Sequence, residues 1–349
     1  MRITEVLLQP TIGGAETLVA GLARRWSAAG DEVETIYLDP PGAPTGRAAR
    51  LRRLSRALER IAPDVVHAHS ALPNIYARLA ARGRWPTVTV LHGAGANFDV
   101  PSLSAAERLL ARWTGHVVAV SADQVAEYRA RFGGSTPVTL IPNGVREDLV
   151  TRSEPSPRLA IAASLCRLEP QKRIDVLTAG WAGADLDGAE LLIAGSARDD
   201  ETHRQAAAWI AACPNARALG DVGDVPDLLS RTDLLVHAAD VEAHPLAPLE
   251  AAVAGVPVIM SDRVAATVPD VPAAVFRAGD PHDLADVIRR VAADHARVSR
   301  IALEAAPVLR ARFSLAASAD GHRRVLEDVV ARHPARGCPE RRVHRAHRS

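Results

Sequence analysis

The sequence predicts an α/β protein with two doubly wound domains, each built on a parallel sheet covered by helices. Short apolar runs rich in Val, Ile and Leu alternate with amphipathic stretches along the whole chain. Such runs, without polar alternation, are typical of strands buried on both faces of a parallel sheet. The length of 349 residues favours two cores over one. A polar, proline-containing segment at 151–158 interrupts the pattern, which then restarts.

The predicted strands form two series that alternate with helices, which indicates βαβ units. The first series is Ile3–Leu8, Val33–Leu38, Val65–Ala68, Thr87–Leu91, Val117–Val120 and Val138–Ile141. The second is Leu159–Leu165, Leu191–Ala194, Leu234–His237, Val256–Met260 and Ala274–Phe276. The stretch Ala15–Ala29 is predicted as a helix that Gly30 terminates in the position of a C-cap.

These patterns divide the chain into five predicted parts. We expect a first domain at 1–150, a linker at 151–158 and a second domain at 159–312. A last helix is predicted at 315–332. The tail at 333–349 is basic and has no apolar periodicity, so we expect it to be disordered.

Composition excludes several classes of protein. The 42 Lys+Arg residues balance 41 Asp+Glu, which argues against a protein that binds nucleic acid by bulk charge. No apolar run approaches the roughly 20 residues that span a membrane, and the N-terminus lacks the pattern of a signal peptide. Cys166, Cys213 and Cys338 are too few, and odd in number, for a disulfide framework. We therefore expect a cytoplasmic protein.

The segment 46–61 has two interpretations. It places Leu51, Leu54, Leu58 and Ile61 on one helical face, with six arginines around them. A basic amphipathic helix of this kind can lie on anionic lipid, which would give weak peripheral contact with the inner face of a membrane. Alternatively, the leucines pack on the first sheet and the arginines face solvent.

Gly13 and Gly14 lie between the first predicted strand and the first helix. A glycine turn at a helix N-terminus exposes amides to which phosphate binds. The alternatives are a tight turn alone, or a dinucleotide site with Asp39 on the ribose. The dinucleotide motif also requires Gly-x-Gly-x-x-Gly, and here the motif stops at the glycine pair.

The second domain contributes two cations and two carboxylates. Arg167 follows its first strand and Lys172, the sole lysine of the chain, is expected to open the next helix. Such a pair can hold a diphosphate, although two solvated surface cations are the alternative. Glu242 and Glu250 flank a loop and helix start, where carboxylates can accept hydrogen bonds from vicinal hydroxyls. For Glu250 alone, complementation of the helix dipole is the alternative.

Histidines occur at strand ends in the first domain. His67, His69 and His92 are expected to face the ligand crevice that lies beyond the carboxyl ends of parallel strands, and His92, before Gly93, is the strongest candidate. The sequence contains no His-Glu-x-x-His, Cys-x-x-Cys, Walker or Gly-x-Ser-x-Gly motif.

Together these segments resemble the retaining glycosyltransferases of family 4, which have the GT-B fold of two facing Rossmann-like domains. The matching segments, in order, are IGGAETLVAGLARRWSAAGDEV, PDVVHAHSALP, TVLHG, VVAVSADQVAEYRARFG, LIPNGV, CRLEPQKRID, LLIAG, ALGDVGDVPDLLSRTDLLVHAA and Glu242 through Val258. The chain departs from the family in having Ala243-His244-Pro245 after Glu242, Cys166 before Arg167, and no glycine in RVAATVPD.

The resemblance implies roles for particular residues. Arg167 and Lys172 would bind the diphosphate of a nucleotide sugar based on UDP or GDP, and the amides of Gly13 and Gly14 would face it from the other domain. The remaining implied donor-site residues are His92 beside the sugar, Glu242 on the sugar, Glu250 on the ribose, and His244, Leu246 and Ala247 around the loop. Backbone in the loops after Ala194 and Gly220 would hold the base, and the last helix would cross back onto the first domain.

The implied activity is transfer of the sugar to an acceptor hydroxyl, with retention of configuration and without a metal or other cofactor. In the family, the departing phosphate helps to deprotonate the acceptor. We expect a small natural-product or cyclitol-type acceptor, no nucleic-acid partner, and domain closure by a hinge near 151–158 and the last helix. The alternatives are a non-catalytic nucleotide-sugar-binding protein, an epimerase or phosphorylase, and a membrane-associated lipid or glycan glycosyltransferase.

Overall fold

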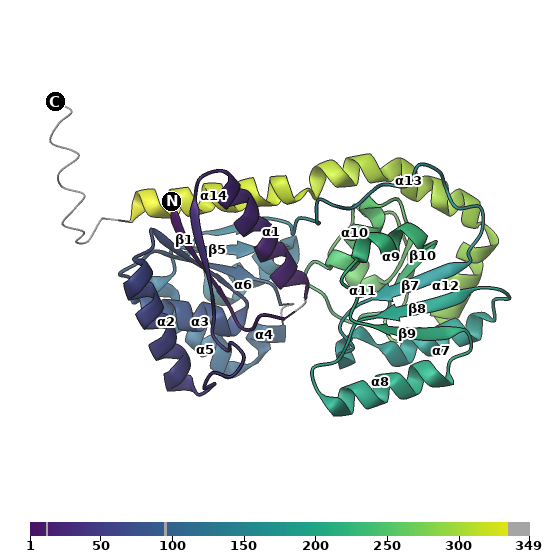
Figure 1. Cartoon of the computed structure of the whole chain (residues 1–349), viewed down its shortest axis with the longest axis horizontal. Helices are drawn as coiled ribbons and strands as arrows, with labels where there is room; N and C mark the ends of the chain where they lie inside the picture. The colour runs from purple at the N-terminus through teal and green to yellow at the C-terminus, as the bar shows by residue number, and fades with distance from the viewer. Residues whose placement is uncertain (12, 94–95, 334–349) are drawn as a thin grey trace.

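The computed structural model describes residues 1–11, 13–93 and 96–333, and it contains two parallel sheets of six strands each. The strand order is β2-β1-β3-β4-β5-β6 in the first sheet and β12-β11-β10-β7-β8-β9 in the second. Helices cover both sheets, and the two domains lie side by side (Figure 1). The predicted architecture of two doubly wound domains is confirmed. The predicted tail lies outside the described residues, apart from His333.

The elements follow one another in βα order. Those of the first domain are β1 (Arg2–Leu7), α1 (Gly14–Ala28), β2 (Glu32–Tyr37), α2 (Arg47–Ile61), β3 (Val65–His69), α3 (Ala71–Ala81), β4 (Thr87–Leu91), α4 (Ala96–Asp99), α5 (Pro101–Leu110), η1 (Ala111–Trp113), β5 (His116–Ala119), α6 (Ala122–Phe132) and β6 (Val138–Leu140). Those that follow are β7 (Ile161–Leu165), η2 (Pro170–Lys172), α7 (Ile174–Ala184), β8 (Glu190–Ala194), α8 (Asp200–Ala212), β9 (Ala216–Gly220), α9 (Val225–Arg231), β10 (Leu234–His237), α10 (Leu246–Val253), β11 (Val258–Ser261), α11 (Asp262–Ala265), β12 (Ala273–Phe276), α12 (Pro281–Ala293), α13 (His295–Arg312) and α14 (Leu315–Arg332).

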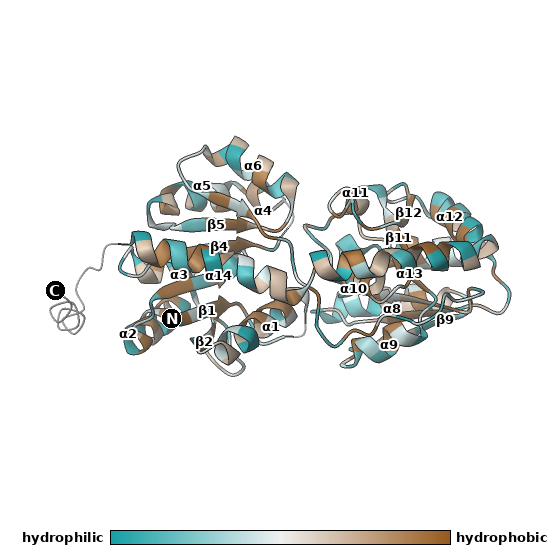
Figure 2. Ribbon diagram, turned by 90° about the horizontal axis from the view of Figure 1, so that it is seen from above, coloured by the Kyte–Doolittle hydropathy of each residue, from teal (hydrophilic) through white to brown (hydrophobic). Residues whose placement is uncertain are grey.

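Every predicted strand is present, and the structure adds one that the sequence pattern does not predict. This strand, β9, has the sequence ARALG, lies at the edge of the second sheet and has no fully buried residue. It contains no β-branched side chain, because an edge position does not require the buried apolar surface that marks the other strands. Figure 2 shows apolar strands enclosed by helices with polar outer faces.

The helix α14 packs on the first domain, as expected. Leu315, Leu326 and Val329 belong to the same buried cluster as Leu18 and Leu22 of α1. In Figure 1 this helix, drawn in yellow, runs along the first domain next to α1. Its register is fixed by a hydrogen bond of 3.2 Å from the indole Nε1 of Trp26 to the carbonyl oxygen of Ala319.

The chain passes between the domains at two adjacent points. Ile141 belongs to the first-domain core and Val145 to the second, while Phe313 belongs to the second and Leu315 to the first. The two passages touch, since the amide of Val145 donates to the carbonyl of Phe313 at 2.8 Å.

A Cβ on Gly144 would come within 2.6 Å of the Leu315 Cα, so only glycine fits between the two passages. The first passage therefore precedes the predicted linker at 151–158. Within that linker, Thr151 donates a hydrogen bond to the carbonyl of Val253 in the second domain.

The helix α2 has its leucines in the first-domain core. Leu54 and Leu58 are fully buried and Leu51 packs against the same cluster. Arg50 Nε donates to Asp39 Oδ1 at 2.7 Å, which holds the helix to the end of β2. This arrangement supports the second interpretation of 46–61, because an apolar face already buried cannot insert into lipid. Among the described helices, none is long and apolar enough to cross a bilayer.

Candidate active site

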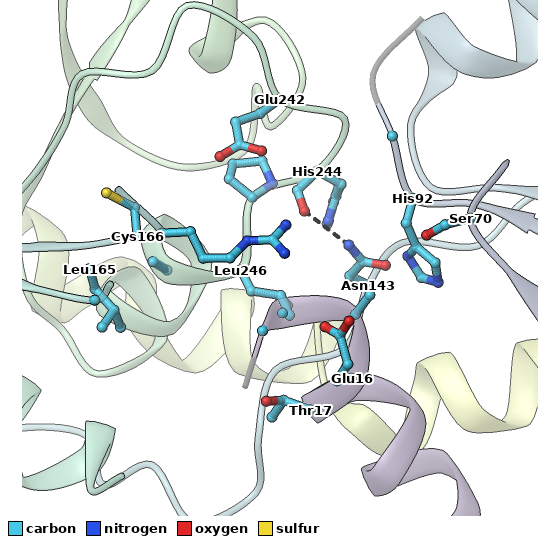
Figure 3. A pocket seen from close by; sticks show the side chains of 18 of the residues that line it. Glu16, Thr17, Ser70, His92, Asn143, Leu165, Cys166, Glu242, His244 and Leu246 are labelled. Atoms are coloured by element: carbon cyan, nitrogen blue, oxygen red, sulfur yellow. Dashed lines mark hydrogen bonds between the residues drawn. The ribbon is translucent and has the colours of Figure 1, made fainter. Parts of the chain in front are cut away.

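A cleft of about 530 Å³ lies between the two domains, and its volume is within the range of small-molecule sites. Residues at or just beyond the carboxyl ends of seven strands line it, which is where ligands bind in doubly wound domains. Eleven of the predicted residues line this cleft: Gly13, Gly14, His69, His92, Arg167, Lys172, Glu242, His244, Leu246, Ala247 and Glu250. The prediction was wrong for His67, which is fully buried behind the cleft lining because its ring packs between Glu5 and His322. Figure 3 shows the side chains from both domains directed into it.

The glycine turn before α1 lies against the second domain. A Cβ on Gly14 would stand 3.2 Å from the Leu246 Cδ1, and one on Gly13 would stand 4.0 Å from the Arg167 guanidinium. The turn and Arg167, one of the two predicted diphosphate cations, therefore face each other. Glu16, which sequence reasoning missed, folds over the same turn, with its carboxylate 2.5 Å from where a Gly13 Cβ would be. An anion at these amides must displace or avoid that carboxylate.

The two predicted cations occupy one wall of the cleft. Lys172 ends the short helix η2, two residues before α7, so it does not open the long helix as expected. Arg167 Nε lies 3.5 Å from Glu169 Oε1, and Arg198 Nε lies 3.3 Å from the same oxygen. Arg198 is a cleft-lining cation that sequence reasoning also missed. Glu169 thus holds two arginines beside Lys172.

The carboxylate of Glu242 accepts hydrogen bonds from Lys172 Nζ and from His237 Nε2, the latter at 2.9 Å. Burial opposes its ionisation, but His237 and Lys172 outweigh burial and lower the pKa of Glu242 to about 2. Glu242 is therefore an anion at every pH of interest. His237 is a missed site residue, although it ends a predicted strand just as the first-domain histidines do.

Glu250 lies in α10 and is 6% exposed. Burial raises the pKa of this carboxyl to about 7, while Arg146 opposes the rise. A proton is thus exchanged at Glu250 near neutral pH. The Glu250 carboxyl ionises at lower pH in the unfolded chain, near the ordinary pKa of 4.5, than in the folded protein. Its contribution to the free energy of unfolding is therefore greatest below pH 4.5 and falls as pH rises toward 7.

His244 contributes mainly to the wall between the domains. Its backbone carbonyl accepts a hydrogen bond of 2.9 Å from Asn143 Nδ2, drawn in Figure 3. Its ring centroid lies 5.6 Å from that of Phe313. Burial, with the charge of Arg312, lowers the pKa of His244 to about 4, so the ring is neutral. Its predicted contact with the donor sugar stays a prediction.

The strand-end histidines of the first domain are connected to one another. His92 Nε2 lies 2.9 Å from His69 Nδ1, and His69 Nε2 lies 2.6 Å from Glu5 Oε2. Within the described part of the chain, the one group of side chains that could share a metal ion is Glu5, His67 and His69, whose ligand atoms lie within 4.8 Å of one another. Glu5 was not predicted. Its only signal is a single acid inside an apolar strand.

Comparison with known families decides the identity of the fold. The model of Glycosyltransferase Family 4 matches residues 12–149, and that of Glycosyl transferases group 1 matches residues 157–294. The chain is a family 4 glycosyltransferase. No curated protein matched the chain in a sequence search.

Solved structures share the fold of this glycosyltransferase at low identity. Anabaena HepE in complex with UDP and glucose is 18% identical, with a TM-score of 0.80 over 94% of this chain and 100% of that one. Sucrose-phosphate synthase from Thermosynechococcus elongatus is 16% identical, with a TM-score of 0.79 over 95% and 99%. A glycosyltransferase from Rickettsia africae is 15% identical, with a TM-score of 0.73 over 95% and 99%. The GT-B fold is confirmed.

The dinucleotide alternative has no support in this glycosyltransferase. Asp39, which would bind a ribose in such a site, is 7% exposed, and both of its carboxylate oxygens accept hydrogen bonds from Arg50. Its role is to hold α2.

Proposed function

We propose that this glycosyltransferase transfers a sugar from a UDP-sugar to a hydroxyl of a small acceptor, with retention of configuration and without a metal ion. The observation that carries the proposal is the cleft in which Arg167 faces the Gly13–Gly14 turn, with Lys172, Glu242 and Glu250 on the same wall as Arg167. Cations, helix amides and hydroxyl-binding carboxylates together match the parts of a nucleotide-diphosphate sugar.

In the proposed complex the diphosphate lies between the glycine turn and the two cations. Glu250 accepts hydrogen bonds from the ribose hydroxyls, and Glu242 contacts the sugar. The base lies against backbone near Gly195, where φ is +128° and an added Cβ would fall 1.9 Å from the Cys166 carbonyl oxygen. Only glycine can stand there, so no side chain covers this part of the wall. The complex of HepE with UDP-glucose supports the choice of a UDP-sugar.

The proposed chemistry is mainly electrostatic. Negative charge gathers on the leaving diphosphate in the transition state, and Lys172, Arg167 and the amides of the first turn of α1 stabilise it. In this mechanism the departing phosphate takes the acceptor proton. The neutral His92 and the anionic Glu242 lie beside the reacting centre without acting as the base. Protein cations supply the charge that a divalent ion supplies elsewhere, and on this ground we propose that none is required.

For the acceptor we propose a small, soluble polyhydroxyl compound. The first-domain side of the cleft presents Ser70, Ala71 and Pro73 beside His92, a surface of modest size with polar groups. The leucines of α2 are in the core, which removes the apolar surface that a lipid-anchored acceptor would favour. Cys166 and Cys213 are free thiols, in keeping with the proposed cytoplasmic location.

The test is a transfer assay with a panel of UDP- and GDP-sugars and cyclitol or natural-product acceptors, with and without EDTA. We expect product only with a UDP-sugar, at an EDTA-independent rate, and with the anomeric configuration of the donor in the NMR spectrum. Inverted product or loss of activity in EDTA would contradict the mechanism. UDP-sugar binding without turnover would favour the non-catalytic alternative, and conversion of the donor without an acceptor would favour an epimerase.

Glu250 predicts a pH dependence of donor binding. With a pKa of about 7, the Glu250 carboxyl is mostly protonated at pH 6. A protonated carboxyl has lost its negative charge, and one of its oxygens carries an O–H donor, so it is a poorer acceptor for two ribose hydroxyls. Donor affinity should therefore fall as pH falls through 7, approaching tenfold per pH unit below it. Calorimetry with UDP-glucose at pH 6, 7 and 8 measures this. That ligand is suitable because its diphosphate diester does not titrate in this range.

The matched variant is Glu250→Gln, which has the same shape and no titrating proton. It should bind UDP-glucose weakly at all three pH values, with the pH dependence gone. An unchanged pH dependence in this variant would show that another group titrates. Equal wild-type affinity at pH 6 and pH 8 would remove Glu250 from the ribose site.

A further inference from the structure

A continuous chain of polar side chains, buried up to the last one, runs from the crossover helix α14 through the first sheet to the cleft. It comprises Glu5 on β1, His67 and His69 on β3, His92 after β4, and His322 on α14. The side chains of Glu5, His67 and His69 are fully buried, and His322 is 1% exposed. His69 and His92 line the cleft, and Figure 3 shows His92 on the first-domain side of it, beside Ser70.

Glu5 stands at the branch point of this chain. Its Oε1 lies 3.0 Å from His67 Nδ1, and its Oε2 lies 2.6 Å from His69 Nε2. On one side, His67 Nε2 lies 3.2 Å from His322 Nδ1. On the other side, His69 Nδ1 lies 2.9 Å from His92 Nε2. Each nitrogen of the two inner rings therefore has one partner.

The carboxylate determines the direction of every hydrogen bond in the branch toward the cleft. An ionised carboxylate only accepts, so His69 Nε2 carries the proton and donates to Glu5. A neutral imidazole has a single N–H, so His69 Nδ1 is an acceptor, and His92 Nε2 must donate to it. The ring of His92 is then left with an unprotonated Nδ1.

The charge states that this order requires are those that the surroundings favour. Burial opposes ionisation of Glu5, but His67 and His69 outweigh it and lower the pKa of Glu5 to about 2. Burial, together with the neighbouring histidines, lowers the pKa of His69 and lowers that of His92 well below its usual value. The branch toward the cleft thus consists of the Glu5 anion followed by the neutral rings of His69 and His92.

We infer that Glu5 is a positioning residue for the transfer reaction, which acts through His69 to hold His92 as the tautomer whose Nδ1 accepts a hydrogen bond from a substrate hydroxyl. The inference rests on the proposed function for the identity of that substrate as a sugar. The buried negative charge also polarises the two rings in sequence, which strengthens Nδ1 as an acceptor.

The other branch determines what Glu5→Gln should do. In this variant the amide nitrogen of the new side chain must face one of the two rings and reverse that branch. Reversal toward His322 would place a proton on its Nε2, a buried atom without a partner among the described residues. Reversal toward His92 places the proton on Nδ1, in the cleft. An unpaired buried N–H is the costlier outcome, so the variant should reverse the branch to His92.

The experiment combines NMR of 15N-histidine-labelled protein with kinetics on the full chain. In the wild type we expect protons on Nε2 of His69 and His92, and on Nδ1 of His67 and His322. In Glu5→Gln we expect His92 to carry its proton on Nδ1. With an unchanged melting temperature and UDP affinity, kcat should fall about tenfold or more, because the hydroxyl loses its acceptor. The control His322→Asn, whose amide can still donate to His67, should retain the tautomer of His92 and kcat.

Four results would overturn the inference. They are a proton on Nδ1 of His92 in the wild type, an unchanged His92 tautomer in Glu5→Gln, a reversed tautomer with unchanged kcat, and one equivalent of a metal ion that is lost in Glu5→Gln. The last would make Glu5, His67 and His69 a metal site. Absence of transfer from any nucleotide sugar would instead contradict the proposed function. The two failures can be told apart, because the NMR measurement of the tautomers does not depend on sugar transfer.

Discussion

Replacing Lys172 with alanine is expected to lower kcat by roughly 10²–10³-fold, because the variant lacks an ammonium group that stabilises charge developing on the leaving diphosphate. The affinity for UDP should also fall, since the same ammonium faces the diphosphate before the reaction. Steady-state kinetics with the active UDP-sugar and calorimetry with UDP measure the two effects. Near-normal turnover would remove Lys172 from the proposed diphosphate site.

Two further variants make this result specific. Lys172→Arg retains the positive charge, but a planar guanidinium cannot take the place of a compact ammonium beside Glu242, so turnover should remain well below the wild type. Arg204→Ala is the control for loss of an exposed cation, because Arg204 pairs with Glu201 of its own helix and is not among the residues that line the cleft. It should leave kcat unchanged. Melting temperatures show whether Lys172→Ala remains folded.

The fold was predictable because buried parallel strands leave a strong mark on a sequence. Runs such as Val65–Ala68 and Leu234–His237 are mostly apolar, and the structure buries both on both faces at the centre of their sheets. The edge strand β9 has no such apolar run. Its sequence, ARALG, contains Arg217 and two alanines, because an exposed edge position does not require large apolar side chains. The predicted linker at 151–158 lies after the first passage between the domains. A polar segment indicates only an exposed stretch of chain, whereas the passage ends at Val145, which is buried in the core of the second domain.

Many residues of the candidate site were predictable, whereas Glu16, Arg198 and His237 were missed and the pairings between residues were not predictable. Arg167 and Lys172 stand at a strand end and before a helix, positions that the sequence shows directly. The contact between Lys172 and Glu242 joins residues 70 positions apart, and periodicity contains no information on such a pair. Glu5 was missed for a related reason. A lone acid in a strand becomes informative only when two histidines of a neighbouring strand are known to contact it.

The pairing of Lys172 with Glu242 changes the view of donor binding. In the free protein the Lys172 ammonium already has an anionic partner in the cleft, the carboxylate of Glu242. A diphosphate that approaches Lys172 also approaches that carboxylate. In the proposed complex, donor affinity is therefore a balance of two anions around one cation. Additional positive charge would come from Arg167 and Arg198, which together share one carboxylate, that of Glu169.

This balance predicts opposite effects of Glu242→Gln on binding and on transfer. Removal of the carboxylate charge frees Lys172 for the diphosphate. It also removes the repulsion between the carboxylate and the diphosphate, which is about 1 kcal/mol for two charges some 4 Å apart in water. UDP binding should therefore become roughly fivefold tighter. Turnover should nevertheless fall by roughly a hundredfold, because the proposed hydroxyl contact of the second carboxylate oxygen is weakened and Lys172 loses the partner that positions it. Calorimetry with UDP and steady-state kinetics measure the two effects.

The sign of the UDP effect separates two roles for Glu242. If the carboxylate only held the fold together, Glu242→Gln would lower the melting temperature and weaken UDP binding as Lys172→Ala does. If it competes with the diphosphate and contacts the sugar, UDP binds more tightly while the sugar is transferred slowly. Because the pKa of Glu242 is about 2, its carboxylate is fully charged at pH 8, where the comparison is made. Weaker UDP binding in Glu242→Gln at pH 8 would therefore refute the competition between the two anions.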